Sequence, residues 1–448
     1  MVDTTRADDP TDEVTDLLQT LIRNQCVNDG TEESGQEHRN VDTLTGYLGD
    51  AGLESETYEI RPGRTSLVTR IEGRNPDAPT LLLMGHTDVV PVSPEGWERD
   101  PFGAELVDGM IWGRGAVDML NMTASMAVAM KHLARSGFTP EGTLAYLAVA
   151  DEESRGVFGA DHLVENEYDA VAADYVITET GGFRFPTPEG PRLPVLVGEK
   201  GTFWCTLRVR GTPGHGSQPF RTDNALVTAA RVVQRLADYE PSARVLDVWR
   251  EFVGSIGLSD DVAALLVDPD RLSDDDTLPI GIARIAHSSM HTTVAPTVIH
   301  GGTKTNVIPD QVDLRLDIRT LPGDNEPEVR AMLDDALGDL AGAVEMIDYH
   351  PDPATESPMD TPLWHHLEKV TRAMVADSAL VPMLMIGATD ARFFRRAGSV
   401  GYGFSLFSER LEYADYATMF HGHNEKVDQE SLRLSTELWQ VVAREVLG

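Results

Sequence analysis

The sequence predicts an α/β protein with a mostly parallel central sheet flanked by helices, interrupted by an inserted α+β domain. Three observations lead to this prediction. The first half of the chain alternates continuous apolar strands with helices, as a sheet covered on both faces requires. Near Gly201 the strands change to alternating polar and apolar residues, which is typical of a sheet with one solvated face. The length of 448 residues allows two or three domains.

Hydrophobic periodicity locates the elements of the first part. Val14, Leu17 and Leu21 recur at helical spacing after Thr11, which is followed by two acidic residues and makes a sound helix start. A second, longer helical pattern follows further along the chain. We expect that helix at 119–135 and buried strands at 66–71, 80–84, 143–150 and 175–178.

The inserted domain is predicted from two strand–helix–strand halves. The expected order is a strand at 202–210, a helix at 224–236, an acidic loop at 260–277, a strand at 311–319, a helix at 326–340 and a strand at 344–349. The stretch 241–300 is longer than this pattern needs, so we expect extra helix there. Residues 350–358 resemble a linker to the last helices, at 361–376 and 429–446. The predicted domains are therefore residues 1–199 with 352–448, and the insert 200–351.

The charge excludes two classes of partner. A formal net charge of −36, from 73 acidic and 37 basic residues, repels nucleic acid and anionic membranes. Only five basic residues are lysines, and the acidic excess is diffuse rather than clustered, which argues against an acidic binding face. This composition is typical of a halophilic protein in a salt-loaded cytoplasm, where the Debye length falls to about 3 Å at 1 M salt.

Further features indicate a cytoplasmic protein. Cys26 and Cys205 lie far apart in the sequence and fit a reduced compartment. The acidic, polar N-terminus is not a secretory signal, and the longest apolar run, 379–388, is too short to span a bilayer.

Acidic residues and histidines follow the predicted buried strands, where ligand sites of open α/β sheets collect. Nucleophile-elbow, P-loop, dinucleotide-binding and H-E-x-x-H motifs are absent from the sequence, which removes several large enzyme classes. The residues at these positions are His86, Asp88, Asp118, Glu152, Glu153, Glu179 and His421.

Each acidic residue, considered alone, is more simply explained as a solvated surface charge. The occurrence of several such residues together at the ends of the predicted strands is not explained in this way. Several carboxylates at one sheet edge repel one another unless cations are present. Nitrogen and oxygen ligands without thiolate suit zinc or a similar divalent metal. One bridging carboxylate, with one histidine and one further carboxylate on each metal, makes a two-metal site able to polarise a carbonyl and activate water.

Along nearly the whole chain, the sequence resembles the cocatalytic zinc hydrolases that include aminoacylase, acetylornithine deacetylase, succinyl-diaminopimelate desuccinylase and the glutamate-type carboxypeptidases. The matching segments, in order, are GHTDVVP, WGRGAVDM, DEESRGVFGA, GHGSQP, NVIPD, DIRTLPG, TDARFFRRAG and HGHNEKV. The resemblance implies a catalytic domain of the zinc-peptidase type, with the insert as lid and dimerisation domain of a homodimer.

The resemblance also implies two divalent metal ions, zinc or else cobalt or manganese. It assigns their ligands as His86 and Glu179 on one metal, Glu153 and His421 on the other, and Asp118 bridging both. Because His423 stands where relatives often carry proline, His421 and His423 are alternative ligands, and the spacing to Glu425 favours His421.

The implied reaction is hydrolysis of an amide bond in a peptide or N-acyl amino acid by a metal-bridging hydroxide. The resemblance assigns Glu152 as general base and Asp88 as the acid that orients His86. It also marks Asp118–Met119 as a candidate cis peptide.

Four further residues can be interpreted either as parts of the active site or as ordinary surface or turn residues. The resemblance implies that Arg319 and Arg392 hold the substrate carboxylate and that Asn306 reaches the substrate, although each is otherwise an ordinary surface or turn residue. It implies that His215 crosses to the partner subunit and donates a hydrogen bond to the oxyanion, whereas local sequence alone suggests a turn histidine between Gly214 and Gly216.

Two alternatives stay open at this stage. The chain could be a non-catalytic scaffold of the same fold, although the full ligand set argues against it. Within enzymes, a carboxypeptidase or dipeptidase is the alternative to a deacylase. The acyl group and amino acid depend on pocket shape, which the sequence does not give.

Overall fold

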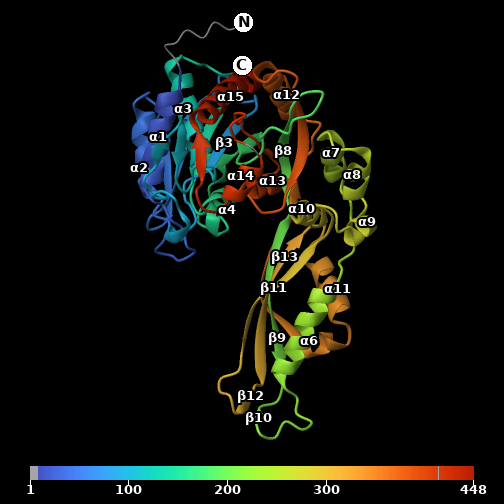
Figure 1. Cartoon of the computed structure of the whole chain (residues 1–448). Coiled ribbons are helices and arrows are strands. Elements are labelled where there is room, and N and C mark those ends of the chain that lie inside the picture. Colours follow the sequence, from blue (N-terminus) through green and yellow to red (C-terminus); the bar gives the residue numbers. More distant parts are fainter. Residues whose placement is uncertain (1–8, 412) are drawn as a thin grey trace.

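The computed structural model describes residues 9–411 and 413–448. Figure 1 shows an elongated molecule, with a large sheet near both termini and a small sheet at the opposite end. Residues 1–8, on which part of the argument against a secretory signal rests, lie outside the described residues. No helix in the described ranges combines the length and the apolar character needed to cross a membrane.

The large sheet has a parallel centre. In spatial order its described strands are β1 (Ser55–Arg61), β2 (Arg64–Ile71), β6 (Leu144–Val149), β3 (Leu81–His86), β7 (Tyr175–Thr178), β17 (Val400–Gly403), β8 (Arg192–Glu199) and β15 (Thr355–Glu356), with β16 (Ala379–Met385) also paired to β8. β3 pairs in parallel with β6 and β7, and β17 in parallel with β7. The predicted fold class is therefore confirmed.

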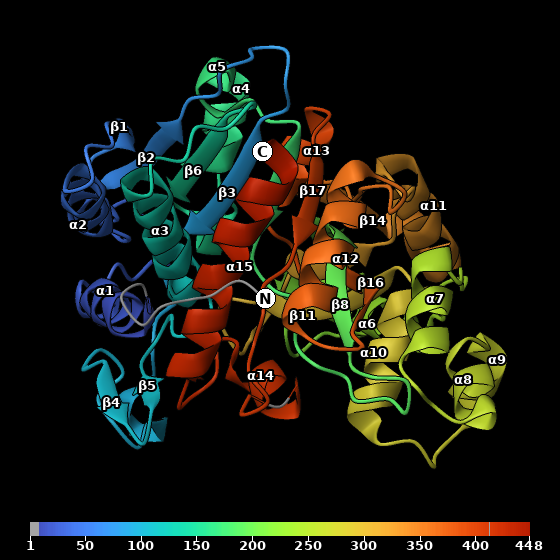
Figure 2. The ribbon, with the colours of Figure 1, turned by 90° about the horizontal axis from the view of Figure 1, so that it is seen from above.

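Helices cover both faces of this sheet. Successive side chains of a strand point to opposite faces, so the apolar strands present apolar side chains on both. On β3, Leu81 and Leu83 join one core cluster, whereas Leu82 and Met84 join another. Figure 2 shows the sheet between its helical layers. The first cluster includes α1 (Thr11–Arg23), α3 (Leu120–Arg135), α12 (Pro362–Met374) and α15 (Gln429–Leu447), and the second α4 (Ala160–Asn166), α5 (Tyr168–Val171) and α13 (Ala391–Arg396).

The small sheet is antiparallel and has one covered face. Its described strands, in order, are β11 (Thr293–Gly301), β13 (Gln311–Thr320), β9 (Gly201–Arg210) and β14 (Val344–Asp352). Phe203, Cys205, Leu207 and Val209 of β9 are buried, as their alternation predicted, in a core shared with α6 (Ala225–Asp238) and α11 (Glu326–Leu337). At the far tip, β10 (Gly214–His215) pairs with β12 (Val307–Ile308).

Other described elements lie outside the two large groups of strands. They are α2 (His38–Gly49), α14 (Tyr413–Met419), the three-stranded sheet β18 (Lys426–Asp428), β5 (Met110–Trp112) and β4 (Glu105–Val107), and the short 3₁₀ turns η1 (Pro94–Gly96), η2 (Glu152–Ser154) and η3 (Gly338–Ala343).

The region 241–300 contains the expected extra helix, but the predicted loop at 260–277 is wrong. The helices there are α7 (Asp247–Ser255), α8 (Asp260–Leu266), α9 (Pro269–Asp274) and α10 (Ile280–Met290). Leu265, Leu266 and Leu272 are buried, so a few apolar residues outweigh the acidic composition that suggested a loop. α7 packs against β16 of the large sheet.

Two other differences concern the return to the large sheet. Residues 350–358 are not a plain linker, because β14 extends into them and β15 pairs with β8. The apolar run that starts at residue 379 forms β16, a strand that the periodicity argument did not assign.

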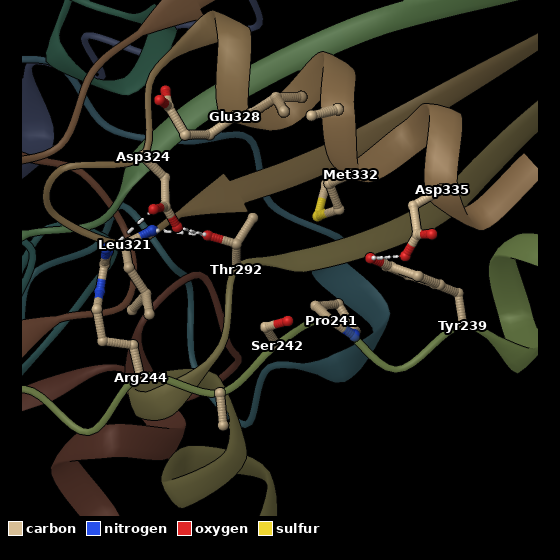
Figure 3. A pocket seen from close by; sticks show the side chains of 13 residues that line it. Tyr239, Pro241, Ser242, Arg244, Thr292, Leu321, Asp324, Glu328, Met332 and Asp335 are labelled. Atoms are coloured by element: carbon tan, nitrogen blue, oxygen red, sulfur yellow. Dashed lines mark hydrogen bonds and ion pairs between the residues drawn. The ribbon is translucent and has the colours of Figure 1, made fainter.

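A network of polar contacts lines a pocket of about 460 Å³ beside α11 (Figure 3). The Thr292 hydroxyl donates a 2.6 Å hydrogen bond to Asp324, and Arg244 lies 3.1 Å from the same carboxylate. Arg244 also donates to the Pro322 carbonyl at 2.6 Å. Arg244 precedes α7 and Thr292 follows α10, so these contacts tie both ends of the α7–α10 segment to the turn after β13.

Lys200 lies at the junction between the sheets, after β8 and before β9. Its buried ammonium donates hydrogen bonds to the carbonyls of Ser288, at 2.9 Å, and His291, at 2.7 Å. Burial and the charge of Arg319 lower the pKa of Lys200 to about 7. The predicted domain limits at 199/200 and 351/352 remain a prediction.

The first testable prediction concerns this lysine. Between about pH 7 and the ordinary lysine pKa of 10.5, the folded state binds fewer protons than the unfolded state, so stability rises with pH. A single group contributes a slope of at most about 1.4 kcal/mol per pH unit. Denaturant unfolding of the wild type and Lys200→Met from pH 7 to 10 should therefore show a steeper rise for the wild type. Parallel curves would contradict the lowered pKa.

Candidate metal centre

The candidate ligands meet at the carboxyl ends of the central strands. β3 ends at His86, η2 follows β6 and carries Glu152 and Glu153, and Glu179 directly follows β7. Two more residues complete the group: Asp118 in the loop before α3, and His421 in the turn after α14. Parallel strands end at one edge of a sheet, so segments far apart in the sequence deliver their side chains to one place.

Asp118 lies between the two histidines. Its Oδ1 is 3.2 Å from Nε2 of His86, and its Oδ2 is 3.3 Å from Nε2 of His421. Glu179 approaches the first histidine, with Oε2 3.9 Å from its Nε2, and Glu153 approaches the second at 3.1 Å. The four flanking residues thus form two pairs, one on each side of the Asp118 carboxylate.

Asp88 fixes the orientation of His86. Nδ1 of His86 donates a 2.9 Å hydrogen bond to the Asp88 carbonyl, which leaves the Nε2 lone pair directed toward Asp118. The Asp88 carboxylate in turn accepts from the backbone N–H groups of Glu152, at 3.3 Å, and Glu153, at 3.1 Å. Asp88 therefore positions the first histidine through its backbone carbonyl and the loop that carries both glutamates through its carboxylate.

The electrostatics of the cluster fit bound cations. Burial raises the pKa of Glu153 to about 7 and that of Glu179 to about 8, with neighbouring carboxylates adding to both shifts. Burial also raises the pKa of Glu152 well above its ordinary value, and the charge of Glu179 reinforces this shift. Oε1 of Glu153 is buried and has no hydrogen-bond partner among the described residues. Positive charge at these oxygens would satisfy all three carboxylates.

The neighbouring carboxylates also raise the pKa values of the two histidines. Burial opposes the protonation of His86, but hydrogen bonds with Asp118 and Asp88 raise its pKa well above the ordinary value. Hydrogen bonds with Asp118 and Glu153 raise the pKa of His421 to about 10. Each histidine faces carboxylates where a divalent cation can replace the proton.

The geometry favours His421 over His423. His423 packs edge-on against Trp97, with ring centroids 6.5 Å apart, and does not belong to the carboxylate cluster. The Asp118–Met119 peptide is cis, as the resemblance implied.

A pocket of about 360 Å³ opens over the cluster and includes residues from both sheets. Arg319 and Arg392 line it, but each already has a carboxylate partner. Arg319 donates to Asp317 at 2.7 Å and 3.2 Å, and buried Arg392 donates to Asp352 at 2.8 Å.

The structure does not bring His215 and Asn306 to this pocket within one chain. His215 belongs to β10 and Asn306 precedes β12, at the end of the molecule farthest from β3 (Figure 1). The backbone N–H of Gly216 donates to the Asn306 carbonyl at 2.8 Å, so the two predicted residues are neighbours.

Comparison with known proteins agrees with this geometry. A sequence model of the peptidase family M20/M25/M40 matches residues 82–445. The chain belongs to this family. It is 26% identical over 389 residues to the N-fatty-acyl-amino acid synthase/hydrolase PM20D1 of Xenopus tropicalis, covering 85% of this chain and 75% of that protein. It is 26% identical over 384 residues to aminoacylase-1 of Mus musculus, covering 85% and 83%.

Solved structures share the fold at low sequence identity. The M20 family metallo-carboxypeptidase Sso-CP2 of Sulfolobus solfataricus has a TM-score of 0.72 at 17% identity, covering 97% of this chain and 99% of that one. Human carnosine dipeptidase 1 has a TM-score of 0.66 at 17% identity, covering 98% and 97%. Bacillus subtilis YXEP, described as a dinuclear metal binding peptidase, has a TM-score of 0.59 at 15% identity, covering 97% and 99%.

Glu425 is a positioning residue whose role sequence reasoning missed. Its fully buried carboxylate accepts from the backbone N–H groups of Val117, at 2.7 Å, and Asp118, at 3.0 Å. It also accepts from Gly115 N–H at 3.0 Å and from Arg114 at 2.7 Å. It therefore ties the His421 segment to the loop that carries Asp118 in this M20 chain.

A second buried group supports Asp88. Asn28 donates to the Asp88 carboxylate at 2.8 Å and accepts from Arg64 at 3.0 Å. Arg64 in turn lies 2.6 Å from Glu37 and 3.5 Å from Asp151. Single acidic residues in such an acidic sequence give no signal of this network, and only their three-dimensional neighbours reveal it.

We predict that Glu425→Gln destabilises the metal-free protein by about 3–5 kcal/mol, because it leaves buried Arg114 uncompensated and turns an amide NH₂ toward backbone N–H groups. Urea unfolding with a chelator present measures this effect. Glu430→Gln is the matched control, since its exposed pair with Arg433 is worth at most about 1 kcal/mol. Equal stabilities of the two variants would contradict the positioning role.

Proposed function

We propose that this protein hydrolyses the amide bond of an N-acyl amino acid or a peptide at a dinuclear metal centre. The supporting observation is the Asp118 carboxylate, which directs one oxygen toward each of two histidines, each accompanied by its own glutamate. His86 and Glu179 would hold one divalent cation, and Glu153 and His421 the other. Zinc suits the nitrogen and oxygen donors, with cobalt or manganese as alternatives.

The relatives support the substrate class. Aminoacylase-1 and the N-fatty-acyl-amino acid synthase/hydrolase match most of this chain, and human carnosine dipeptidase 1 shares its fold. All three names describe proteins that act on amide bonds beside an amino acid. A panel of N-acyl amino acids and dipeptides, assayed in high salt with added zinc, manganese or cobalt, separates deacylase from peptidase activity.

When bound, two cations would polarise the scissile carbonyl and lower the pKa of a water molecule. Glu152 lies beside the candidate ligands, with a carboxylate oxygen within 4.8 Å of potential ligand atoms of His86 and Glu179. We assign it to accept the proton of the attacking water and to pass this proton to the leaving amine. Glu153 would hold a metal, and Asp88 would keep His86 in the tautomer that a metal ligand needs.

This mechanism predicts different effects for neighbouring carboxylates. Glu152→Gln should keep both metals but lose about a hundredfold or more in turnover, because a positioned proton acceptor is removed. Glu153→Ala and Asp118→Ala should lose metal. Metal analysis of the purified variants, together with a chelator-sensitive amidase assay, measures both effects. Glu165→Gln, at an exposed glutamate of α4, is the control, and normal turnover by Glu152→Gln would overturn the mechanism.

We further propose a homodimer through the insert, in a salt-loaded cytoplasm. β11 is an edge strand of the small sheet, and its Val298 and Ile299 are 36% and 49% exposed. A second copy would cover this unpaired edge, which is otherwise a site for aggregation. In such a dimer, His215 could reach the partner's centre and donate a hydrogen bond to the oxyanion, with Asn306 beside it.

Subunit exchange tests the action of His215 in trans. His215→Ala should keep metal and dimerise but lose about a hundredfold in turnover, since an oxyanion donor is removed. Mixing it with Glu152→Gln dimers should restore activity, because some mixed dimers contain one intact composite site. No recovery after demonstrated exchange would mean that His215 acts within its own chain or has no catalytic role.

A further inference from the structure

Arg155 has an unusual backbone conformation beside the proposed general base. It follows η2, three residues after Glu152, and has a φ of +81°. A side chain with a Cβ rarely adopts this left-handed region, where glycine is the favoured residue. Such outliers persist where the surrounding structure imposes them, and they cluster at functional sites. The backbone conformation of Arg155 therefore marks it as a candidate functional residue.

The guanidinium of Arg155 reaches from the large sheet to the small one. Its Cζ lies 6.0 Å from the ring centroid of Trp204, on β9, near the outer limit of a cation–π contact. Trp204 is 41% exposed, and its Nε1 donates to Asp317 at 3.2 Å, which fixes the ring. Arg155 and Trp204 line both the pocket over the metal centre and an adjoining pocket of about 480 Å³.

Arg155 differs from the other two arginines of the pocket because, among the described residues, its guanidinium has no carboxylate partner. Arg319 pairs with Asp317, and Arg392 with Asp352. Within the described ranges, the guanidinium of Arg155 makes no hydrogen bond and no ion pair. Among the arginines of this pocket, Arg155 is thus the one whose charge no described carboxylate neutralises at ion-pair distance.

A cation of this kind suits the substrate class of the proposed function. An N-acyl amino acid or a peptide carries a carboxylate, which a guanidinium lining the pocket over the metal centre can bind. The guanidinium of Arg155, which lines the same pocket, offers parallel N–H donors that match carboxylate geometry. The neighbouring indole face offers an apolar surface for the carbon atoms beside that carboxylate.

We propose that Arg155 binds the substrate carboxylate, with Trp204 packed against the adjacent apolar group, and so determines the preference for substrates with a free carboxylate. This inference rests on the proposed amidase function. It assigns carboxylate recognition to a residue of the Glu152–Glu153 segment, in addition to the two arginines expected from the sequence.

The test compares an N-acetyl amino acid with its C-terminal carboxamide. In Arg155→Gln, the ratio of kcat/KM for acid over carboxamide should fall about tenfold or more, as expected for the loss of one charge-assisted contact. The change should lie mainly in KM. Arg155→Lys should retain most of the ratio because it keeps the charge. Arg231→Gln, at an exposed arginine of α6, should leave the ratio unchanged.

Arg155→Gly separates recognition from a structural role. Glycine suits the left-handed backbone, so this variant should melt at the same or a higher temperature while its acid-to-carboxamide ratio falls as in Arg155→Gln. Trp204→Leu should raise KM for the acid and the carboxamide alike, leaving their ratio unchanged. A lower melting temperature of Arg155→Gly with an unchanged ratio would show that Arg155 only supports the fold, and would overturn the inference.

Different results would contradict the proposed amidase function and the proposed role of Arg155. If the wild type cleaves neither an N-acyl amino acid nor a dipeptide with any of the three metals, the proposed function is wrong. If the wild type cleaves the acid and Arg155→Gln keeps the wild-type ratio, the function stands and the assignment of Arg155 is overturned.

Discussion

The structure depends on keeping several carboxylates together in a buried place. Asp118, Glu152, Glu153 and Glu179 are brought to one edge of the large sheet, where burial raises the pKa values of the three glutamates. Two histidines relieve part of this repulsion, and cations can relieve the rest. A sheet of parallel strands is suited to this arrangement because it delivers residues from separate segments to one edge without crowding their backbones. The position of the site therefore follows from the topology.

Further buried charges hold the ligands in place. Asp88 and Glu425 each accept several hydrogen bonds, and most of these come from the backbone of loops that carry ligands. Buried ion pairs are weak contributors to stability, since desolvation offsets their attraction. The Arg114–Glu425 pair instead fixes the distance between the Asp118 loop and the His421 segment. The proposed dinuclear centre would tolerate little error in that distance, which gives these buried charges a positioning role.

Periodicity predicted the central strands β2, β3, β6 and β7 and long helices such as α3 and α15, because burial on one or both sheet faces leaves a direct trace in the sequence. Strand β9 and helix α3 lie within a residue or so of their expected limits. The helices α8 and α9 were missed because their few buried leucines stand among acidic residues. The cluster residues could be found from strand ends, whereas Glu425 and Arg155 could not. Their importance depends on what their side chains meet, and on a backbone φ at Arg155 that no sequence pattern reveals.

Strand geometry explains why the predicted site residues fall into two groups. One group lies at the edge of the large sheet, and the other, His215 and Asn306, lies at the far tip of the small sheet. β9 begins at the pocket, where Trp204 lies, and runs toward the far tip of the small sheet. The seven residues from Trp204 to Arg210 are separated by six steps of roughly 3.3 Å and so span about 20 Å, and the β10–β12 hairpin lies beyond them. His215 and Asn306 therefore cannot reach the centre of their own chain without bending a strand paired on both sides. Any catalytic donor from that tip must serve another copy, whereas carboxylate recognition by Arg155 needs only the chain that carries it.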